Sequence, residues 1–209
     1  MIPTNAALER LREGNLRFAE DRREGVTGTL RRTGLVAGQQ PFAIILGCSD
    51  SRVPAEIVFD QGLGDLFVIR VAGNIVAPSQ IGSIEYAAEV TGARLVVVMG
   101  HSNCGAVQAT IDELQRPQAN RSRNLRSIVD RIRPAVETLF ETGLAQDRAA
   151  LVRYAVRANI RASVDHLRHG SEILERLTEK DGLLVVGAEY SLDTGLVEFF
   201  DRPPVPPRE

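Results

Sequence analysis

Residues 42–52 read FAIILGCSDSR and join an apolar run to a polar, chemically reactive end. The run at residues 42–47 is short, continuous and bounded by turn residues, which is typical of a strand buried on both faces of a parallel sheet. Similar runs follow at residues 66–70, 95–99 and 183–186, and helical stretches separate them. This alternation of strands and helices predicts an α/β fold.

The segments between and after these runs complete the predicted architecture. Pro78 suits the first turn of one helix, Gly105 opens another, and two long amphipathic helices follow near residues 122–142 and 148–168. Residues 196–200 follow a turn and are predicted to pair antiparallel with the strand before them. We therefore expect about four parallel strands and one antiparallel edge strand in a single sheet flanked by helices.

The N-terminal segment is expected to form a helical arm. Thr4 or Asn5 is a candidate cap for its first helix, whose apolar positions lie only loosely on one face: Leu8, Leu11, Leu16 and Phe18. A helix with such a weak pattern is expected to pack on a partner surface.

The chain is predicted to be a single domain over residues 1–209, because neither a repeat nor a linker divides it. Within this domain we expect an N-terminal helical arm and connection at residues 1–40 and an α/β core at 41–202. The tail at residues 203–209 is rich in proline, so it is expected to be extended rather than part of a strand.

Composition excludes several classes of function. A formal net charge of −2 provides no basic field, so nucleic acid and membrane surfaces are not expected partners. The first fifteen residues, MIPTNAALERLREGN, are charged throughout and lack the apolar run of a secretory signal, and no apolar stretch is long enough to span a membrane. We therefore expect a cytoplasmic protein.

Four side chains able to bind a metal follow two of the predicted strands. Cys48 and Asp50 come directly after the first strand, and His101 and Cys104 come directly after the third. The carboxyl ends of neighbouring parallel strands meet at one edge of a sheet, where open α/β sheets bind ligands. Thiols stay reduced in the cytoplasm, so the chain's only two cysteines are interpreted as metal ligands rather than as a disulfide.

The ligand types indicate which metal is expected. Two thiolates and one imidazole suit zinc, and three protein ligands with an open fourth position are typical of a catalytic zinc site. Individually, Cys48 and Cys104 would be read as small buried hydrophobes and His101 as a loop histidine with its hydrogen bonds satisfied. Their joint occurrence at two strand ends favours zinc.

Asp50 and Arg52 are two residues apart, so in an extended segment their side chains point the same way. A forked pair with Arg52 would keep Asp50 ionised and turned away from the metal. Two thiolates cancel the zinc charge and make a bound water less acidic, so Asp50 would help by accepting a hydrogen bond from zinc-bound hydroxide. Release by Arg52 would let Asp50 bind zinc and close the site. A simple loop salt bridge is the alternative.

With these residues assigned, the sequence resembles the β-class carbonic anhydrases from about residue 8 to residue 200. The segments CSDSR at 48–52 and HSNCG at 101–105 resemble the two signature motifs of that family, and several other positions match: Pro54, Arg70, Asn74 and residues 82–87. The resemblance implies one zinc ion per subunit on Cys48, His101 and Cys104, and an Asp50 and Arg52 dyad. It also implies a homodimer or dimer-built tetramer, with the active site near the interface and N-terminal helices that embrace the partner.

The resemblance further implies substrate-binding roles for Asn74, Gly105 and Gln61. Plant-type members carry the substrate-contacting glutamine one residue after Gln61, where this chain has Gly62. Members regulated by bicarbonate hold that ion with a tryptophan, an arginine and a tyrosine. Two of these match, as Arg70 and Tyr190, and the tryptophan is replaced by Ile45.

The expected function is reversible hydration of carbon dioxide to bicarbonate and a proton. A carbonyl sulfide or carbon disulfide hydrolase of the same fold is one alternative, because those linear substrates use the same kind of zinc site. A non-enzymatic zinc protein, closed permanently by Asp50, is the other. Arg52 argues against it, because a structural ligand gains nothing from a competing guanidinium.

Overall fold

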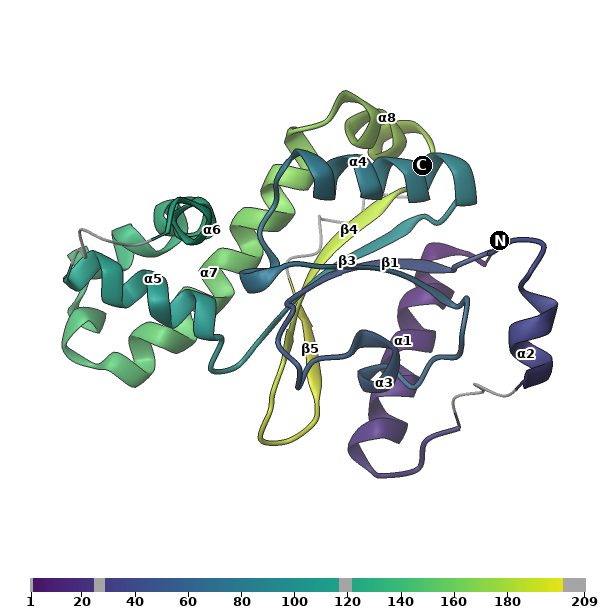
Figure 1. Cartoon of the computed structure of the whole chain (residues 1–209), viewed down its shortest axis with the longest axis horizontal. Coiled ribbons are helices and arrows are strands. Elements are labelled where there is room, and N and C mark those ends of the chain that lie inside the picture. The colour runs from purple at the N-terminus through teal and green to yellow at the C-terminus, as the bar shows by residue number, and fades with distance from the viewer. Residues whose placement is uncertain (1, 25–28, 117–121, 201–209) are drawn as a thin grey trace, which may run out of the picture.

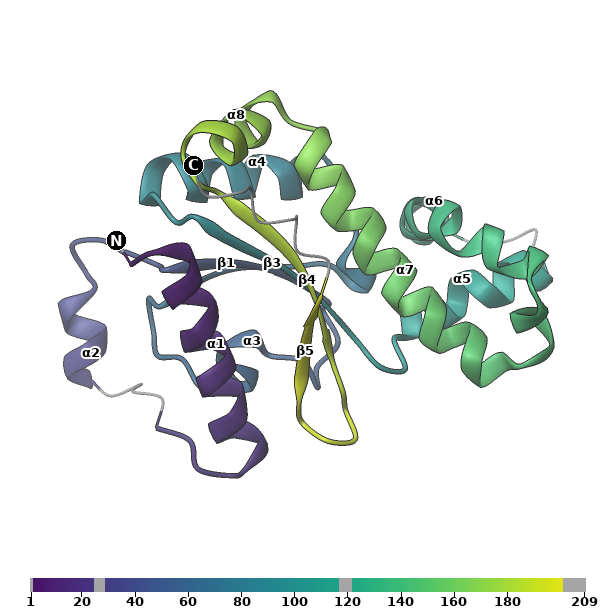
Figure 2. The ribbon, with the colours of Figure 1, turned by 180° about the vertical axis from the view of Figure 1, so that it is seen from behind.

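The computed structural model describes residues 2–24, 29–116 and 122–200, and this part of the chain forms one central sheet with helices on both faces (Figures 1 and 2). The strands are β1 (Ala43–Gly47), β2 (Leu66–Arg70), β3 (Leu95–His101), β4 (Leu184–Tyr190) and β5 (Val197–Phe200). Their order is β2-β1-β3-β4-β5, with the first four parallel and β5 antiparallel to β4. The predicted α/β fold, with four parallel strands and an antiparallel edge strand, is confirmed.

The helices divide between the two faces of the sheet (Figure 1). Two pack below the strands in that view, α1 (Thr4–Ala19) and α3 (Ala55–Val58). The others that join the core lie across the opposite face or extend from it: α4 (Pro78–Tyr86), α5 (Gly105–Gln115), α6 (Arg123–Glu137), α7 (Arg148–His169) and α8 (Glu172–Lys180). Shorter elements complete the chain: α2 (Thr29–Gly34), η1 (Ala72–Asn74), the π-helical η2 (Ala87–Thr91), η3 (Thr138–Glu141) and η4 (Gly143–Gln146).

Helices on both faces explain why the central strands are apolar at every position. In β1, Ile44 and Leu46 enter the core beneath α7, whereas Ala43 and Ile45 enter the core that contains α1. All five residues of β1 and all seven of β3 are buried. An alternating pattern would leave polar side chains in one of these cores, and burying them without partners is costly.

The helices predicted from sequence are present with two differences. Pro78 and Gly105 begin α4 and α5, as predicted, and the two long helices near residues 122–142 and 148–168 correspond to α6 with η3 and to α7. The short helices α2 and α3 and the amphipathic α8 were not predicted. The predicted cap of α1 is wrong, because Pro3 occupies the N-cap position and the Thr4 hydroxyl instead donates to the Gly182 carbonyl at 3.2 Å.

Helix α1 packs on its own chain through part of its apolar positions. Leu8 and Leu11 are fully buried in the core beside β1 and β3. Asn15 ties the helix down by donating to the carbonyls of Val58 and Gly195, at 3.1 and 2.9 Å. Leu16 differs from Leu8 and Leu11, because its side chain is 50% exposed to solvent.

Replacing Leu11 by alanine should lower the free energy of unfolding by about 2–5 kcal/mol, because it leaves a cavity in a packed core. Leu16→Ala on the same helix is the matched control and should change it by at most about 0.5 kcal/mol. Urea denaturation at two protein concentrations measures both. An equal effect of the two variants, or an effect of Leu11→Ala that vanishes on dilution, would mean that α1 packs on a partner.

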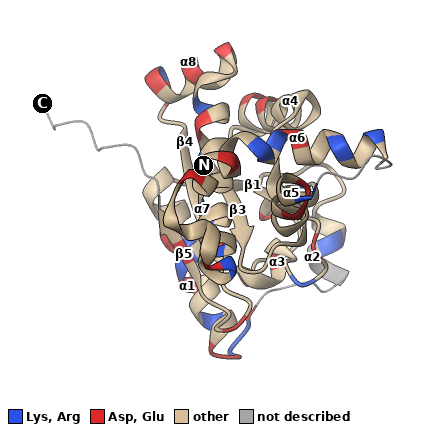
Figure 3. Ribbon diagram, turned by 90° about the vertical axis from the view of Figure 1, so that its left-hand side faces the viewer, with Lys and Arg blue, Asp and Glu red and all other residues tan. Residues whose placement is uncertain are grey.

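Charge, hydropathy and the C-terminal tail were also considered in the sequence. Basic and acidic residues both occur along the helices (Figure 3), and the formal net charge of the chain is −2. None of the helices among the described residues is both long and apolar enough to cross a membrane. The proline-rich tail predicted at residues 203–209 lies outside the described residues.

Candidate metal centre

The predicted ligands meet where the strand order changes direction. The chain leaves β1 toward β2 on one side and leaves β3 toward β4 on the other, so the carboxyl ends of β1 and β3 flank a topological switch point. Cys48 directly follows β1, His101 is the last residue of β3, and Cys104 is the N-cap residue of α5. The end of β3 and the turn that follows it therefore carry two of the three side chains, and the residue after the neighbouring strand β1 carries the third.

The ligand atoms of Cys48, His101 and Cys104 all lie within 4.8 Å of one another, and the three residues are buried. Both cysteines are free thiols, as the sequence predicted. Two sulfurs and one imidazole nitrogen at this spacing are a donor set that prefers a borderline-soft cation, and the hard cations calcium and magnesium would require oxygen ligands.

His101 is oriented as a ligand by its own loop. Its Nδ1 lies 2.9 Å from the Ser102 carbonyl, which can only accept, so Nδ1 carries the proton and Nε2 presents a lone pair. That Nε2 atom is buried and has no hydrogen-bond partner among the described residues. A buried acceptor without a partner is costly, and a bound cation would satisfy it.

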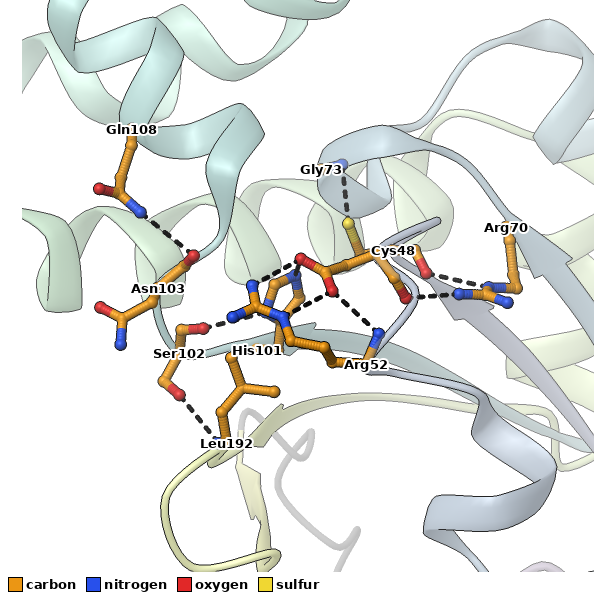
Figure 4. A network of polar contacts seen from close by, with 10 residues as sticks. Cys48, Arg52, Arg70, Gly73, His101, Ser102, Asn103, Gln108 and Leu192 are labelled. Atoms are coloured by element: carbon orange, nitrogen blue, oxygen red, sulfur yellow. Dashed lines mark hydrogen bonds and ion pairs between the residues drawn. The ribbon is translucent and has the colours of Figure 1, made fainter.

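The two thiols influence each other strongly. A hydrogen bond from Cys104 lowers the pKa of the Cys48 thiol to about 4 against the opposing effect of burial, and the Gly73 backbone N–H, 3.3 Å from Cys48 Sγ, adds to the lowering (Figure 4). The same sulfur contact, together with burial, raises the pKa of Cys104. A second thiolate beside the first therefore requires a cation between them, which fits a metal site.

Asp50 and Arg52 form a forked pair at the edge of this group. Arg52 Nε and Nη2 lie 2.9 and 2.8 Å from the two Asp50 oxygens, and the Arg52 backbone N–H donates to Asp50 Oδ1 at 3.0 Å. These bonds hold the pKa of the Asp50 carboxyl well below its usual range. Asp50 is therefore ionised at neutral pH, and the stability it contributes is lost only as the pH falls below about 4. Its Oδ2 lies 3.8 Å from His101 Nε2.

Arg70 fastens the loop that bears Cys48 and Asp50. Its guanidinium donates to the Cys48 carbonyl at 3.1 Å and to the Asp50 carbonyl at 2.6 Å (Figure 4). In the sequence, Arg70 and Tyr190 match two of the three residues that hold bicarbonate in regulated members, and Ile45 replaces the third. Tyr190 is buried with its ring 6.2 Å from that of Phe18, and Ile45 is a core residue. Arg70 therefore binds the backbone of the loop at residues 48–50, a contact that the sequence did not indicate.

The three residues suggested for substrate binding differ in their surroundings. The Gln61 amide donates to the Phe59 carbonyl at 2.7 Å, which is a contact within its own loop rather than with the metal group. Asn74 is buried with a left-handed φ of 45°, and its Nδ2 has no partner among the described residues. Gly105 begins α5 next to Cys104, and a Cβ built there would meet no atom within 4 Å.

An open α/β sheet with a Cys-His-Cys group at its switch point defines a metalloprotein, and comparison with known proteins identifies its family. The family model for carbonic anhydrase matches residues 43–197. Carbonic anhydrase 2 of Mycobacterium tuberculosis is 39% identical over 191 residues, which covers 91% of this chain and 89% of the relative. A carbonic anhydrase of Mycolicibacterium smegmatis is 38% identical and covers 92% and 91%.

Solved structures agree with the sequence comparison. The β-carbonic anhydrase CafA of Aspergillus fumigatus matches with a TM-score of 0.72 and 25% identity, covering 94% of this chain and 90% of that chain. Two tetrameric β-carbonic anhydrases from Sordaria macrospora were described together, and a chain from that work matches with a TM-score of 0.72 at 24% identity, covering 81% and 85%. This chain therefore belongs to the β-class carbonic anhydrases, a family of lyases.

Proposed function

We propose that this chain is a zinc-dependent carbonic anhydrase that catalyses the reversible hydration of carbon dioxide to bicarbonate and a proton. The observation that carries the proposal is the buried group of Cys48, His101 and Cys104, with ligand atoms within 4.8 Å of one another. These three residues would hold one zinc ion per subunit and leave a fourth position open. Zinc bound there would supply Lewis acidity, which makes a water molecule a nucleophile near neutral pH.

Asp50 and Arg52 are assigned catalytic roles in this proposal. Asp50 is anionic and lies 3.8 Å from the ligand atom of His101, so it can accept a hydrogen bond from the attacking water and orient it. Arg52 holds both carboxylate oxygens, which keeps Asp50 from occupying the metal itself. If Arg52 released it, Asp50 could serve as a fourth ligand and close the site.

The substrate-binding roles remain assigned to Asn74, Gly105 and Gln61. The unpartnered amide of Asn74 and the open space at Gly105 support the first two. A role for Gln61 requires its amide to leave the Phe59 carbonyl. Carbon dioxide is small and apolar, so the pocket needs few polar contacts.

The proposed assembly is a homodimer or a dimer-built tetramer in the cytoplasm. The described tetramers of Sordaria macrospora support an oligomer. Two free cysteines suit a compartment in which thiols stay reduced.

Stopped-flow assays should show carbon dioxide hydration that rises from pH 6.5 to 9, with about one zinc ion per chain counted on the same sample. The nucleophile in hydration is hydroxide, so the rate should rise with pH as the water at the metal centre loses its proton. Asp50 is already charged across this range and does not cause the rise.

A rate independent of pH over this range would contradict the mechanism. Faster turnover of carbonyl sulfide or carbon disulfide than of carbon dioxide would indicate a hydrolase of the same fold. Absence of hydration at alkaline pH in zinc-loaded protein would indicate a non-enzymatic zinc protein.

A further inference from the structure

Two polar side chains of α7 are buried where the helix should be apolar. Asn159 is 2% exposed and Ser163 is 5% exposed, and their spacing of four residues places them on one helix face. The other buried residues of this helix, apart from these two, are apolar. A buried amide and hydroxyl are costly unless they are hydrogen-bonded, so their partners indicate what they do.

Both partners are backbone carbonyls of the short element η1. Asn159 Nδ2 donates to the Gly73 carbonyl at 2.8 Å, and Ser163 Oγ donates to the Asn74 carbonyl at 3.1 Å. Gly73 and Asn74 have φ values of 72° and 45°, both in the left-handed region. Two consecutive left-handed residues are strained when the second is not glycine, so this turn needs outside contacts to persist.

The turn held in this way donates to the metal group. The Gly73 N–H lies 3.3 Å from Cys48 Sγ (Figure 4). A Cβ at Gly73 would stand 2.8 Å from Ile132 Cδ1, so the turn is also packed closely against α6. The carbonyls that Asn159 and Ser163 hold belong to the two peptide units after this N–H, so holding them restricts the direction in which it points.

We propose that Asn159 and Ser163 are positioning residues of the metal centre, which hold the 73–74 turn so that its N–H donates to the Cys48 sulfur. This inference rests on the proposed metal centre and extends it to a helix that supplies none of the three ligands. An N–H donor withdraws electron density from a thiolate and restrains its position, and loss of such an outer partner typically weakens metal binding about 10- to 100-fold.

The test uses Asn159→Leu, which keeps a similar volume and removes the donor, in the full-length protein loaded with cobalt or with zinc. The thiolate-to-cobalt charge-transfer band should move to lower energy, because the sulfur becomes more electron-rich. In competition with a chelator, zinc should be bound about 10- to 100-fold more weakly. Asn15→Leu is the matched control, because Asn15 is equally buried and also bonds to backbone atoms, through three hydrogen bonds, but lies in α1, on the other face of the sheet.

Ser163→Ala removes a single hydroxyl and should change the band and the zinc affinity in the same direction by a smaller amount. The proposal therefore stays testable if Asn159→Leu does not fold. An unchanged band and unchanged zinc affinity in Ser163→Ala and Asn159→Leu would overturn the positioning role alone. Equal changes in Asn15→Leu would also overturn it, because the cause would then be general destabilisation. If the wild-type protein shows no thiolate-to-cobalt band, the metal centre itself fails and the inference fails with it.

Discussion

Replacing Asp50 by asparagine should lower the rate of carbon dioxide hydration by about 10²- to 10⁴-fold while zinc stays at about one ion per chain. The amide has nearly the shape of the carboxylate but no charge, so it is a poorer acceptor for the attacking water. Arg52 also loses the charged partner to which it now donates at 2.9 and 2.8 Å. Stopped-flow hydration and metal analysis of the same preparation measure both quantities.

Asp112→Asn is the matched control for Asp50→Asn. Asp112 also pairs with an arginine, Arg148, at 2.8 Å, but both side chains are about half exposed and neither belongs to the metal group. Its loss should leave hydration unchanged, because exposed ion pairs contribute little. Normal hydration in Asp50→Asn would show that the Asp50 and Arg52 pair is a loop salt bridge without a catalytic role.

Replacing Cys104 by serine should remove both the metal and the activity. Zinc should fall from about one ion per chain to a small fraction, because a neutral hydroxyl replaces a thiolate and only Cys48 and His101 remain as ligands. The wild-type protein should lose thermal stability when a chelator removes the metal, because ligand binding favours the folded state. The variant should melt at the same temperature with and without chelator.

Thr110→Val controls for disturbance of α5, the helix that Cys104 begins. Thr110 is fully buried, and its hydroxyl donates to the Ala106 carbonyl of the same helix at 2.9 Å. This variant should keep zinc and should retain the chelator-dependent shift in melting temperature. Zinc at wild-type stoichiometry in Cys104→Ser, with the same resistance to chelator, would remove Cys104 from the ligand set.

The fold could be predicted in outline because its strongest signals are local. Residues 42–47 and 95–99 are apolar at every position, and only a strand covered on both faces requires this. The first residues of two helices were also predicted, at Pro78 and Gly105. The predicted N-cap of α1 was wrong, because Pro3 is the N-cap residue. The Thr4 hydroxyl instead donates to the Gly182 carbonyl, far away in the sequence, and this contact depends on tertiary packing.

The site could be predicted in part for the same reason. Cys48 and His101 stand at the ends of two strands, and parallel strands bring such ends together whatever lies between them. Asn159 and Ser163 were not predicted, although two polar residues on the buried stripe of a long helix were a usable signal. Their partners are backbone carbonyls at Gly73 and Asn74, which no side-chain motif reveals.

The sequence by itself determined the α/β class, the strand ends that carry the metal ligands and the close spacing of Asp50 and Arg52, since all three follow from short-range patterns. Only the tertiary structure decided that α1 packs on its own chain and that Arg70 holds the metal-binding loop. Tertiary structure alone also placed the 73–74 turn against α7 and Cys48. These contacts join residues far apart in the chain through backbone atoms, whose directions are set by folding rather than by residue type.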